Sequence, residues 1–423
     1  MEVLLEGRAP IRFTHPDDFR EWVRTHKRRE PVEKLLSARE AVAQYVADGD
    51  YIAYDFSSLT RGPQALVREI IRQRRRELWV CAEFTLHETA LLTGAGCCDR
   101  IDVGFLGYGG YIGRAVSEGR VRVCEWTNGS LAVRMLAGAR GVPFLPVRNL
   151  LATDTLLQSG AKVIRDPFTG DPVCLVPALN PDVFLCHVHQ ADLFGNARIF
   201  GTNLFALEAA TAAKKVIVST EEIIDPGEIR QDPARTTIPY FLVDAVVHLP
   251  FGAYPGGVPA RYELDLEHID RVNAIQDDAA MQAYLEEYIY GVPDHETFLE
   301  RKVGWDRLKA LIRRATVREG RTARDRLGTP QSGARRRGTR SGRAARPRTA
   351  RRAARAGARR RGAGRARAAA RVRLAARVRR AGARRGVAGA RMGARLRGRL
   401  ARAGGAADAS ARAALHRAGT LRG

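Results

Sequence analysis

The sequence predicts an α/β protein with an open, mostly parallel sheet and flanking helices. Through most of the first 320 residues, short apolar runs of strand length alternate with longer segments of helical periodicity. Residues 182–188 form a nearly continuous apolar run, which is typical of a strand buried on both faces. A helical segment at 204–213 and a second apolar run at 216–219 follow it, and this order of elements requires a parallel crossover.

The other expected elements alternate in the same way. Before residue 107 they are helix 39–47, strand 51–54, helix 63–73, strand 78–82, helix 86–92 and strand 101–106. Strand 120–124, helix 130–138 and strand 245–249 extend the sheet, and helices 276–290 and 297–315 follow it. Residues 1–33 show weak periodicity and many charges, so we expect an extension that precedes a single domain at 34–318.

Residues 319–423 form a low-complexity basic tail. From residue 321 on, 33 Arg and two Asp give a net charge of +31, whereas the whole chain carries +25. The tail contains no Phe, Trp, Tyr or Ile, so it cannot form a packed core. It is either the product of GC-rich codons translated in a shifted frame, a disordered solvated segment, or an arm that binds nucleic acid through its phosphates.

The first 320 residues have the composition of a cytoplasmic enzyme. They contain all six cysteines, and these form no Cys-x-x-Cys pair, so we expect reduced, buried thiols. The first residues are charged throughout and do not resemble a secretory signal. No apolar stretch approaches the ~18 residues that a membrane helix needs, so we expect no membrane partner.

The candidate site lies in the loops after the strands, because open parallel sheets bind ligands at the carboxyl ends of their strands. The loop at 55–63 offers Ser57, Ser58 and Arg61, whose polar groups could hold a carboxylate. The alternative is a capped loop with a solvated Arg61.

A second loop, at 107–113, is rich in glycine but lacks the Gly-x-Gly-x-x-Gly spacing, because Ile112 takes the place of the third glycine. A dinucleotide cofactor is therefore not expected. The glycines either let the backbone approach a substrate closely or form a flexible turn.

Asn128 is the third feature of this edge, between strand 120–124 and helix 130–138. An amide donor beside the free N–H groups of a helix start can stabilise an oxyanion, and losing such a donor typically costs ~10²- to 10³-fold in rate. The alternative is an asparagine that only caps the helix.

His187 and His189 project to one side of their strand, and Asp192 follows, so these three residues could bind a metal. A further strong ligand is not evident and Cys186 points to the opposite face. We therefore favour buried, hydrogen-bonded roles and expect no metal.

Glu221 and Glu222 follow Ser219 and Thr220. This pattern fits a helix capping box better than a pair of catalytic carboxyls.

Several long sequence blocks carry a resemblance to a known family. They are NGSLA at 128–132, GVPFLP at 141–146, HVHQADLFGNARIFG at 187–201, STEEIIDPGEIRQDP at 219–233 and VDAVVHLPFGAYPGG at 243–257. With these blocks the core, roughly residues 35–311, resembles the alpha subunit of the class I coenzyme A transferases. It is most similar to the glutaconate CoA-transferase type.

The resemblance implies an enzyme that moves CoA between carboxylic acids, in which the nucleophile is a glutamate of a partner beta subunit. The glutamate would pass through a mixed anhydride and become a glutamyl-CoA thioester. The substrates would be acyl-CoA and carboxylic acids, and no permanently bound cofactor is implied. Asn128 stands where the family has Gln followed by Gly, so Asn128 and Gly129 are expected to stabilise the oxyanion.

The family's Gly-Gly-Phe loop is replaced here by Asp55, Phe56 and Ser57. A carboxylate at Asp55 would repel an anionic acid unless Arg61 offsets it. The residues that would shape the acid pocket are Ser57, Ser58, Arg61, Tyr108 and Gly109.

We therefore expect the alpha subunit of a cytoplasmic, hetero-oligomeric CoA-transferase. The alternative within the same fold is a hydrolase or ring-cleaving subunit that uses an acidic residue on CoA thioesters in steroid or aromatic catabolism, and the neutral Asn128 opposes it. Sugar-phosphate isomerases share the fold, but the phosphate loop and internal base that they need are not found. Nucleic-acid binding would depend on the basic tail alone.

Overall fold

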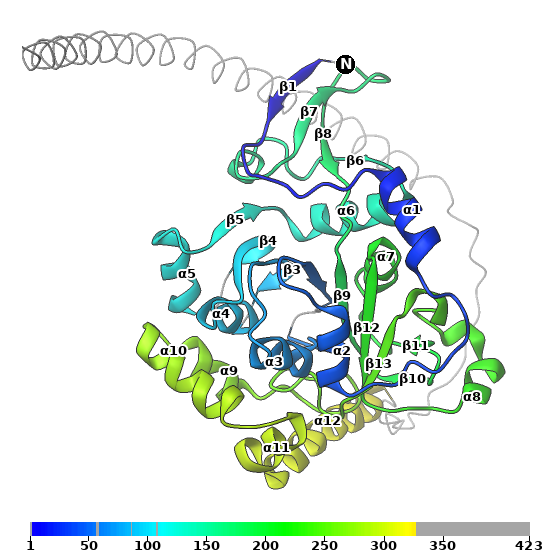
Figure 1. Ribbon diagram of the computed structural model, residues 1–423, viewed down its shortest axis with the longest axis vertical. Coiled ribbons are helices and arrows are strands. Elements are labelled where there is room, and N and C mark those ends of the chain that lie inside the picture. Colours follow the sequence, from blue (N-terminus) through cyan, green and yellow to red (C-terminus); the bar gives the residue numbers. More distant parts are fainter. Residues whose placement is uncertain (1, 56–58, 86, 107–108, 327–423) are drawn as a thin grey trace, which may run out of the picture. The chain divides into compact units, whose positions relative to one another are not determined.

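The computed structural model describes residues 2–55, 59–85, 87–106 and 109–326 (Figure 1). Ser57, Ser58 and Tyr108 lie outside these ranges, as do residues 327–423 of the basic tail. Within the described ranges, no helix is both long and apolar enough to cross a membrane.

A seven-stranded sheet forms the centre of the fold and confirms the predicted α/β class. Its strands lie in the order β13-β12-β9-β2-β3-β4-β5, and every neighbouring pair is parallel. The strands are β2 (Tyr51–Tyr54), β3 (Leu78–Thr85), β4 (Cys98–Leu106), β5 (Arg122–Glu125), β9 (Val183–Val188), β12 (Lys215–Thr220) and β13 (Ala245–His248). Because all seven run in one direction, their carboxyl ends share one edge.

Helices cover both faces of this sheet (Figure 1). One face carries α2 (Ala38–Tyr45), α3 (Gln64–Arg72), α4 (His87–Gly94) and α5 (Gly110–Ser117), and the other carries α6 (Asn128–Arg140) and α7 (Ala206–Ala212). Successive strand residues alternate between the two faces. Ile52 therefore packs in the same core as Leu66 of α3, whereas Ala53 packs in the core that contains Leu131 of α6.

A buried charge pair fixes α6 on the sheet. Arg134 Nη1 of α6 lies 2.6 Å from Asp102 Oδ2 of β4, and both side chains are fully buried. Tyr51 and Trp79 also donate hydrogen bonds to the Asp102 carboxylate, at 2.5 and 3.0 Å. Because the charges compensate each other and the carboxylate accepts two further bonds, the pair can be buried without an unpaired ion. It holds the first turn of α6 near the carboxyl edge of the sheet.

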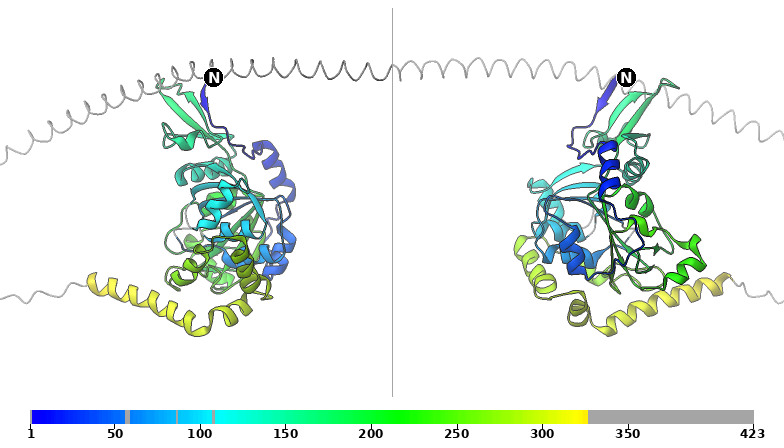
Figure 2. Two further views of the ribbon diagram at one scale, coloured as in Figure 1. Left: turned by 90° about the vertical axis from the view of Figure 1, so that its left-hand side faces the viewer. Right: turned by 45° about the vertical axis from the view of Figure 1, so that its right-hand side comes forward.

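A second sheet of four antiparallel strands differs from the sequence prediction, which contained no such unit. It has the order β1-β7-β8-β6, formed by β1 (Val3–Glu6), β6 (Phe144–Val147), β7 (Lys162–Arg165) and β8 (Pro172–Pro177). It contacts α6, and its buried residues join the core on that side of the large sheet. In both views of Figure 2 it lies at the opposite end of the described residues from α12.

Residues 1–33, expected as an extension, supply β1 and also helix α1 (Pro16–His26). Lys27, directly after α1, forms a buried ion pair of 2.8 Å with Asp244 before β13. The segment is thus attached to both sheets.

Helices complete the described part of the chain. They are α9 (Leu266–Asn273), α10 (Asp278–Leu285), α11 (His295–Phe298) and α12 (Trp305–Arg326), with π-helical segments at Glu286–Tyr290 and Leu299–Val303. The expected helix at 297–315 is broken at Gly304, whose φ of 83° ends the preceding segment. Shorter elements are α8 (Pro226–Gln231) and the hairpin strands β10 (Gln190–Ala191) and β11 (Ala197–Arg198).

Candidate active site at the carboxyl edge of the sheet

Strand register brings four sequence-distant residues into one row across the carboxyl edge. Ala53 pairs with Cys81 of β3, so Glu83 lies beside Asp55, two residues further along both chains. Tyr54 pairs with Leu185 of β9, so Cys186 lies on the other side of Asp55. Ala82 lies beside Val103, which places Gly104 on the other side of Glu83. The row therefore reads Cys186, Asp55, Glu83 and Gly104 on four neighbouring strands, and it faces α6.

Asp55 and Arg61 form a buried ion pair in this row. Arg61 Nη1 lies 2.6 Å from Asp55 Oδ2, and the side chains are 1% and 0% exposed. Arg61 also donates to the carbonyl oxygens of Thr202, at 2.9 Å, and His187, at 3.4 Å. The sequence suggested that Arg61 could hold a substrate carboxylate or lie in solvent, and the carboxylate that it holds in the structure is that of Asp55.

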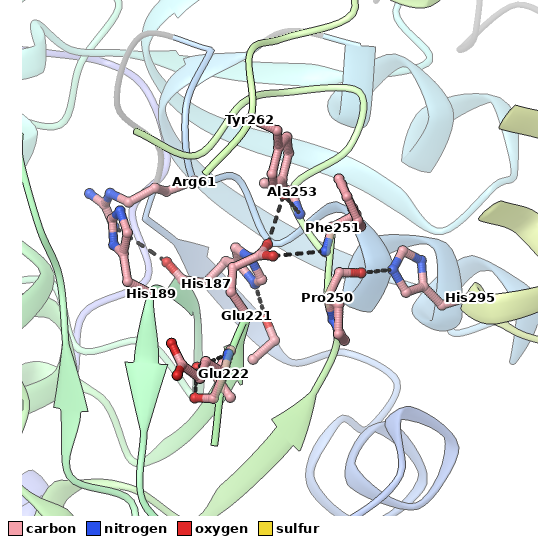
Figure 3. Close-up of polar contacts among 12 residues, drawn as sticks. Arg61, His187, His189, Glu221, Glu222, Pro250, Phe251, Ala253, Tyr262 and His295 are labelled. Atoms are coloured by element: carbon pink, nitrogen blue, oxygen red, sulfur yellow. Dashed lines mark hydrogen bonds and ion pairs between the residues drawn. The ribbon is translucent and has the colours of Figure 1, made fainter. Parts of the chain in front are cut away.

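His187 joins a hydrogen-bonded network beneath the loop after β13 (Figure 3). Its Nε2 lies 2.7 Å from Glu221 Oε1, and its Nδ1 lies 2.9 Å from Ser219 Oγ. Glu221 also accepts from Tyr262 Oη at 2.8 Å and from the Phe251 N–H at 2.9 Å. Burial alone would raise the pKa of Glu221, but these hydrogen bonds lower it below its usual value.

The capping-box interpretation of Glu221 and Glu222 is wrong. Glu221 binds His187, Phe251 and Tyr262, and Glu222 accepts from Gln190 and Arg261, so neither side chain closes a helix start.

His189 and Asp192 are held by protein partners. His189 Nε2 lies 3.0 Å from the Pro259 carbonyl oxygen, and its Nδ1 accepts from the Phe200 N–H. Burial lowers the pKa of His189 to about 4. Asp192 accepts from consecutive N–H groups at residues 194–196 and so closes the turn before β11. These contacts support the hydrogen-bonded roles, and the described residues contain no group of three side chains placed to hold a metal.

Asn128 and Gly129 are the first two residues of α6. Thr127 caps this helix by accepting from the Ser130 N–H, and Ser130 Oγ returns a contact to the Thr127 N–H, so Asn128 does not act as the cap. Within the described residues, neither the Asn128 amide nor the N–H groups of Asn128 and Gly129 have a hydrogen-bond partner. The backbone N–H groups of Asn128 and Gly129 and the Asn128 amide nitrogen are thus donors without a described partner at the positive end of a helix.

Gly104 makes room for the Asn128 amide. A Cβ atom at position 104 would lie 2.1 Å from Asn128 Oδ1, which is a severe steric clash. Glycine at this strand position thus lets Asn128 lie directly over β4, next to the row that contains Glu83.

Glu83 is a candidate site residue that the sequence did not reveal. It is 4% exposed, and no hydrogen bond to its carboxyl is found among the described residues. Burial, with a smaller contribution from Asp55, raises its pKa to about 8. The only available signal was a charged residue near the end of a strand that is otherwise apolar and aromatic, and its importance depends on register with Asp55 and Gly104.

Gly109 lies at the start of α5 with a φ of 92°, a backbone conformation that favours glycine. A Cβ there would lie 3.5 Å from Asn273, so this turn packs closely on α9. All six cysteines are free and buried, as expected.

A parallel sheet that has a helix start with unpaired donors and several buried carboxyls at its carboxyl edge is a framework on which enzyme sites are built. Residues 35–249 match the family model described as Coenzyme A transferase, and the chain belongs to this family. It is a CoA-transferase chain of the alpha type.

Relatives and a solved structure agree with this assignment. The chain is 33% identical over 276 residues to the A-type subunit of 3-oxoadipate CoA-transferase from Pseudomonas knackmussii, covering 63% of this chain and 96% of the relative. It is 30% identical to the A-type subunit of glutaconate CoA-transferase from Acidaminococcus fermentans, covering 66% and 94%. The crystal structure of glutaconate coenzyme A-transferase from that organism superposes with a TM-score of 0.62 at 28% identity, covering 66% of this chain and 95% of that chain.

Proposed function

We propose that this chain is the alpha subunit of a heteromeric enzyme that moves CoA between carboxylic acids, and that a partner beta subunit supplies the nucleophilic glutamate. The observation that carries the proposal is the pair of N–H donors at Asn128 and Gly129, which have no partner among the described residues and lie at a helix start at the carboxyl edge. The names of the relatives, which designate one subunit of a larger enzyme, support the existence of a partner.

The carboxyls of this chain near the row are poorly suited to nucleophilic attack. Asp55 is paired with Arg61, and Glu221 accepts three hydrogen bonds, so both would have to give up strong partners first. Glu83 has a pKa of about 8 and is largely neutral at physiological pH. A carboxylic acid attacks far less readily than a carboxylate, which favours a nucleophile from another polypeptide.

In the proposed reaction, a carboxylate oxygen of the partner glutamate attacks the thioester carbonyl, and the carbon–sulfur bond then breaks to release the CoA thiolate. The thiolate attacks the glutamyl carbonyl of the mixed anhydride, releasing the first acid and leaving a glutamyl-CoA thioester. A second acid reverses these steps. The carbonyl oxygen becomes negative in each addition, and the donors at Asn128 and Gly129 would stabilise it.

The acid pocket is proposed to involve Ser57, Ser58, Arg61, Tyr108 and Gly109. Arg61 contributes indirectly, because its pairing with Asp55 removes a negative charge that would otherwise repel an anionic acid.

Trapping the intermediate tests this function. The chain is co-purified with its beta subunit, incubated with an acyl-CoA and treated with borohydride, which reduces a thioester but leaves a carboxylate unchanged. The expected result is one reduced glutamate in the beta subunit, found by peptide mass spectrometry. A modified residue in this chain, or full CoA exchange by this chain alone, would overturn the proposal.

A further inference from the structure

Glu83 lies in the same strip of the sheet as the proposed oxyanion donors. Its β4 neighbour is Gly104, and the Asn128 amide occupies the space that a side chain at Gly104 would fill. Neighbouring strands lie about 4.8 Å apart, so the Asn128 amide is about one strand spacing from the backbone of Glu83. The Glu83 side chain faces α6, and the Asn128 side chain, at the start of α6, faces the sheet.

The charges around Glu83 are already paired with one another. The titratable and charged groups on the elements that face it are Cys81 on its own strand, Asp55 after β2, Cys186 on β9, Asp102 on β4, Cys124 on β5, and Arg61 and Arg134, which pair with the two aspartates. Both arginines are therefore committed, and no described cation offers Glu83 an ion pair. Burial raises the pKa of the cysteine thiols, so they are neutral as well.

Such surroundings keep the proton on Glu83. Its pKa of about 8 leaves the carboxyl mostly neutral at physiological pH, with an O–H group that has no acceptor among the described residues. A neutral carboxyl can donate a hydrogen bond, whereas an ionised one can only accept. A nearly buried donor that has no partner among the described residues is suited to bind an anionic oxygen.

We propose that Glu83 is a substrate-binding residue that donates a hydrogen bond to the carboxylate of the acid that receives CoA. The inference rests on the proposed transfer between carboxylic acids and adds a residue that selects the anionic form of the free acid. The bond would hold the second carboxylate oxygen while Asn128 contacts the first. Ionised Glu83 would instead repel the acid.

The pH dependence of the Michaelis constant for the free acid tests the role of Glu83. The complex with the beta subunit is assayed at pH values on both sides of 8, with acetate, succinate and the free acid of the best donor as probes. For the wild type, KM for the acid rises above pH 8, approaching about tenfold per pH unit as the neutral fraction of Glu83 falls. Turnover at saturating acid changes much less.

Two variants complete the experiment. Glu83→Gln keeps a neutral donor of the same size, so its KM for the acid stays flat across this pH range, whereas Glu83→Ala has a raised KM at every pH. Glu222→Gln is the matched control, because Glu222 is partly exposed and pairs with Arg261 away from the row, and it keeps the wild-type profile. A flat wild-type profile, or a Glu83→Gln profile that rises like the wild type, would overturn the inference.

The borohydride trap separates this inference from the proposed function. Formation of glutamyl-CoA from an acyl-CoA does not require the free acceptor acid, so Glu83→Gln should give the same trapped product as the wild type. If the product forms but the KM profiles do not differ, the role of Glu83 is wrong and the transferase mechanism stands. If no variant and no wild-type sample gives the product, the mechanism itself fails.

Discussion

Arg61 neutralises Asp55 through a 2.6 Å contact in which neither side chain reaches solvent. The sequence offered two expectations for Arg61, a residue that holds a substrate carboxylate or a solvated residue of a capped loop. The charges of the pair cancel at the carboxyl edge, next to the loop at 56–58 that lies outside the described residues.

Removing either member of the pair should destabilise the chain strongly. Asp55→Asn or Arg61→Gln alone leaves one buried charge without a partner, at a cost of about 3–5 kcal/mol. The double substitution removes both charges and should cost clearly less than the sum of the two. Urea unfolding of the four proteins measures this coupling, and additive losses would show that the pair contributes no mutual stabilisation.

Asn128→Ala should reduce turnover by roughly two orders of magnitude in the complex with the beta subunit, because one oxyanion donor is lost. Asn149→Ala is the control: Asn149 donates to Thr127 Oγ1 at 2.6 Å, and its loss should affect the helix cap more than catalysis. Steady-state kinetics and size-exclusion chromatography report turnover and assembly. Unchanged turnover in Asn128→Ala would remove this residue from the mechanism.

The Glu221 network predicts a stability difference that depends on pH. The pKa of Glu221 in the folded chain lies below its ordinary value of 4.5, so its stabilising contribution is present above pH 4.5 and is lost as the pH falls through the folded value. Glu221→Gln should therefore melt at a lower temperature than the wild type at neutral pH, with the gap narrowing in acid. Thermal midpoints across this range measure the gap. A constant gap would contradict the lowered pKa.

Glu83 predicts the opposite trend. Its folded pKa of about 8 exceeds the ordinary 4.5, so the folded chain retains a proton that the unfolded chain has released, and stability falls as the pH rises between these values. Glu83→Gln lacks this penalty. The unfolding free energy of Glu83→Gln relative to that of the wild type should therefore rise between pH 4.5 and about 8, by at most ~1.4 kcal/mol per pH unit. Denaturant unfolding at several pH values checks this, and a pH-independent difference would exclude a raised pKa.

Deleting residues 327–423 should leave transferase activity unchanged, because every site residue placed by the structure precedes them. If the arginine-rich tail is a genuine polyanion-binding arm, the same deletion should abolish salt-sensitive retention of RNA or DNA. Comparing activity and retention before and after deletion tests both expectations. Loss of activity would show that the tail belongs to the enzyme.

The large sheet could be predicted because its central strands are short, nearly continuous apolar runs. β9 is apolar on both sides, since helices cover both faces, and each expected strand of this sheet is found within a few residues of its predicted position. The small sheet gave no comparable signal. Pro146 lies within β6 and Pro172 begins β8, and proline is typical of edges and turns rather than of strand interiors.

The site was partly predictable for a similar reason. Asn128 lies where a strand passes into a helix, a local pattern that the sequence displays directly. Glu83 becomes informative only once register sets it between Asp55 and Gly104, and such pairing is a long-range property of the sheet. The sequence raised Arg61 as a charge that could offset Asp55, but it did not show that the pair is buried, because nothing in the loop sequence distinguishes a buried guanidinium from a solvated one.

Strand β1 has a practical consequence for anyone shortening this chain. Val3, Leu5 and Glu6 pair with β7 at the outer margin of the small sheet. A polypeptide starting at residue 34 would lose β1, so the backbone groups of β7 that pair with β1 would become the open edge of this sheet. The first few residues thus supply backbone partners to the small sheet, even though they are far in sequence from the candidate site.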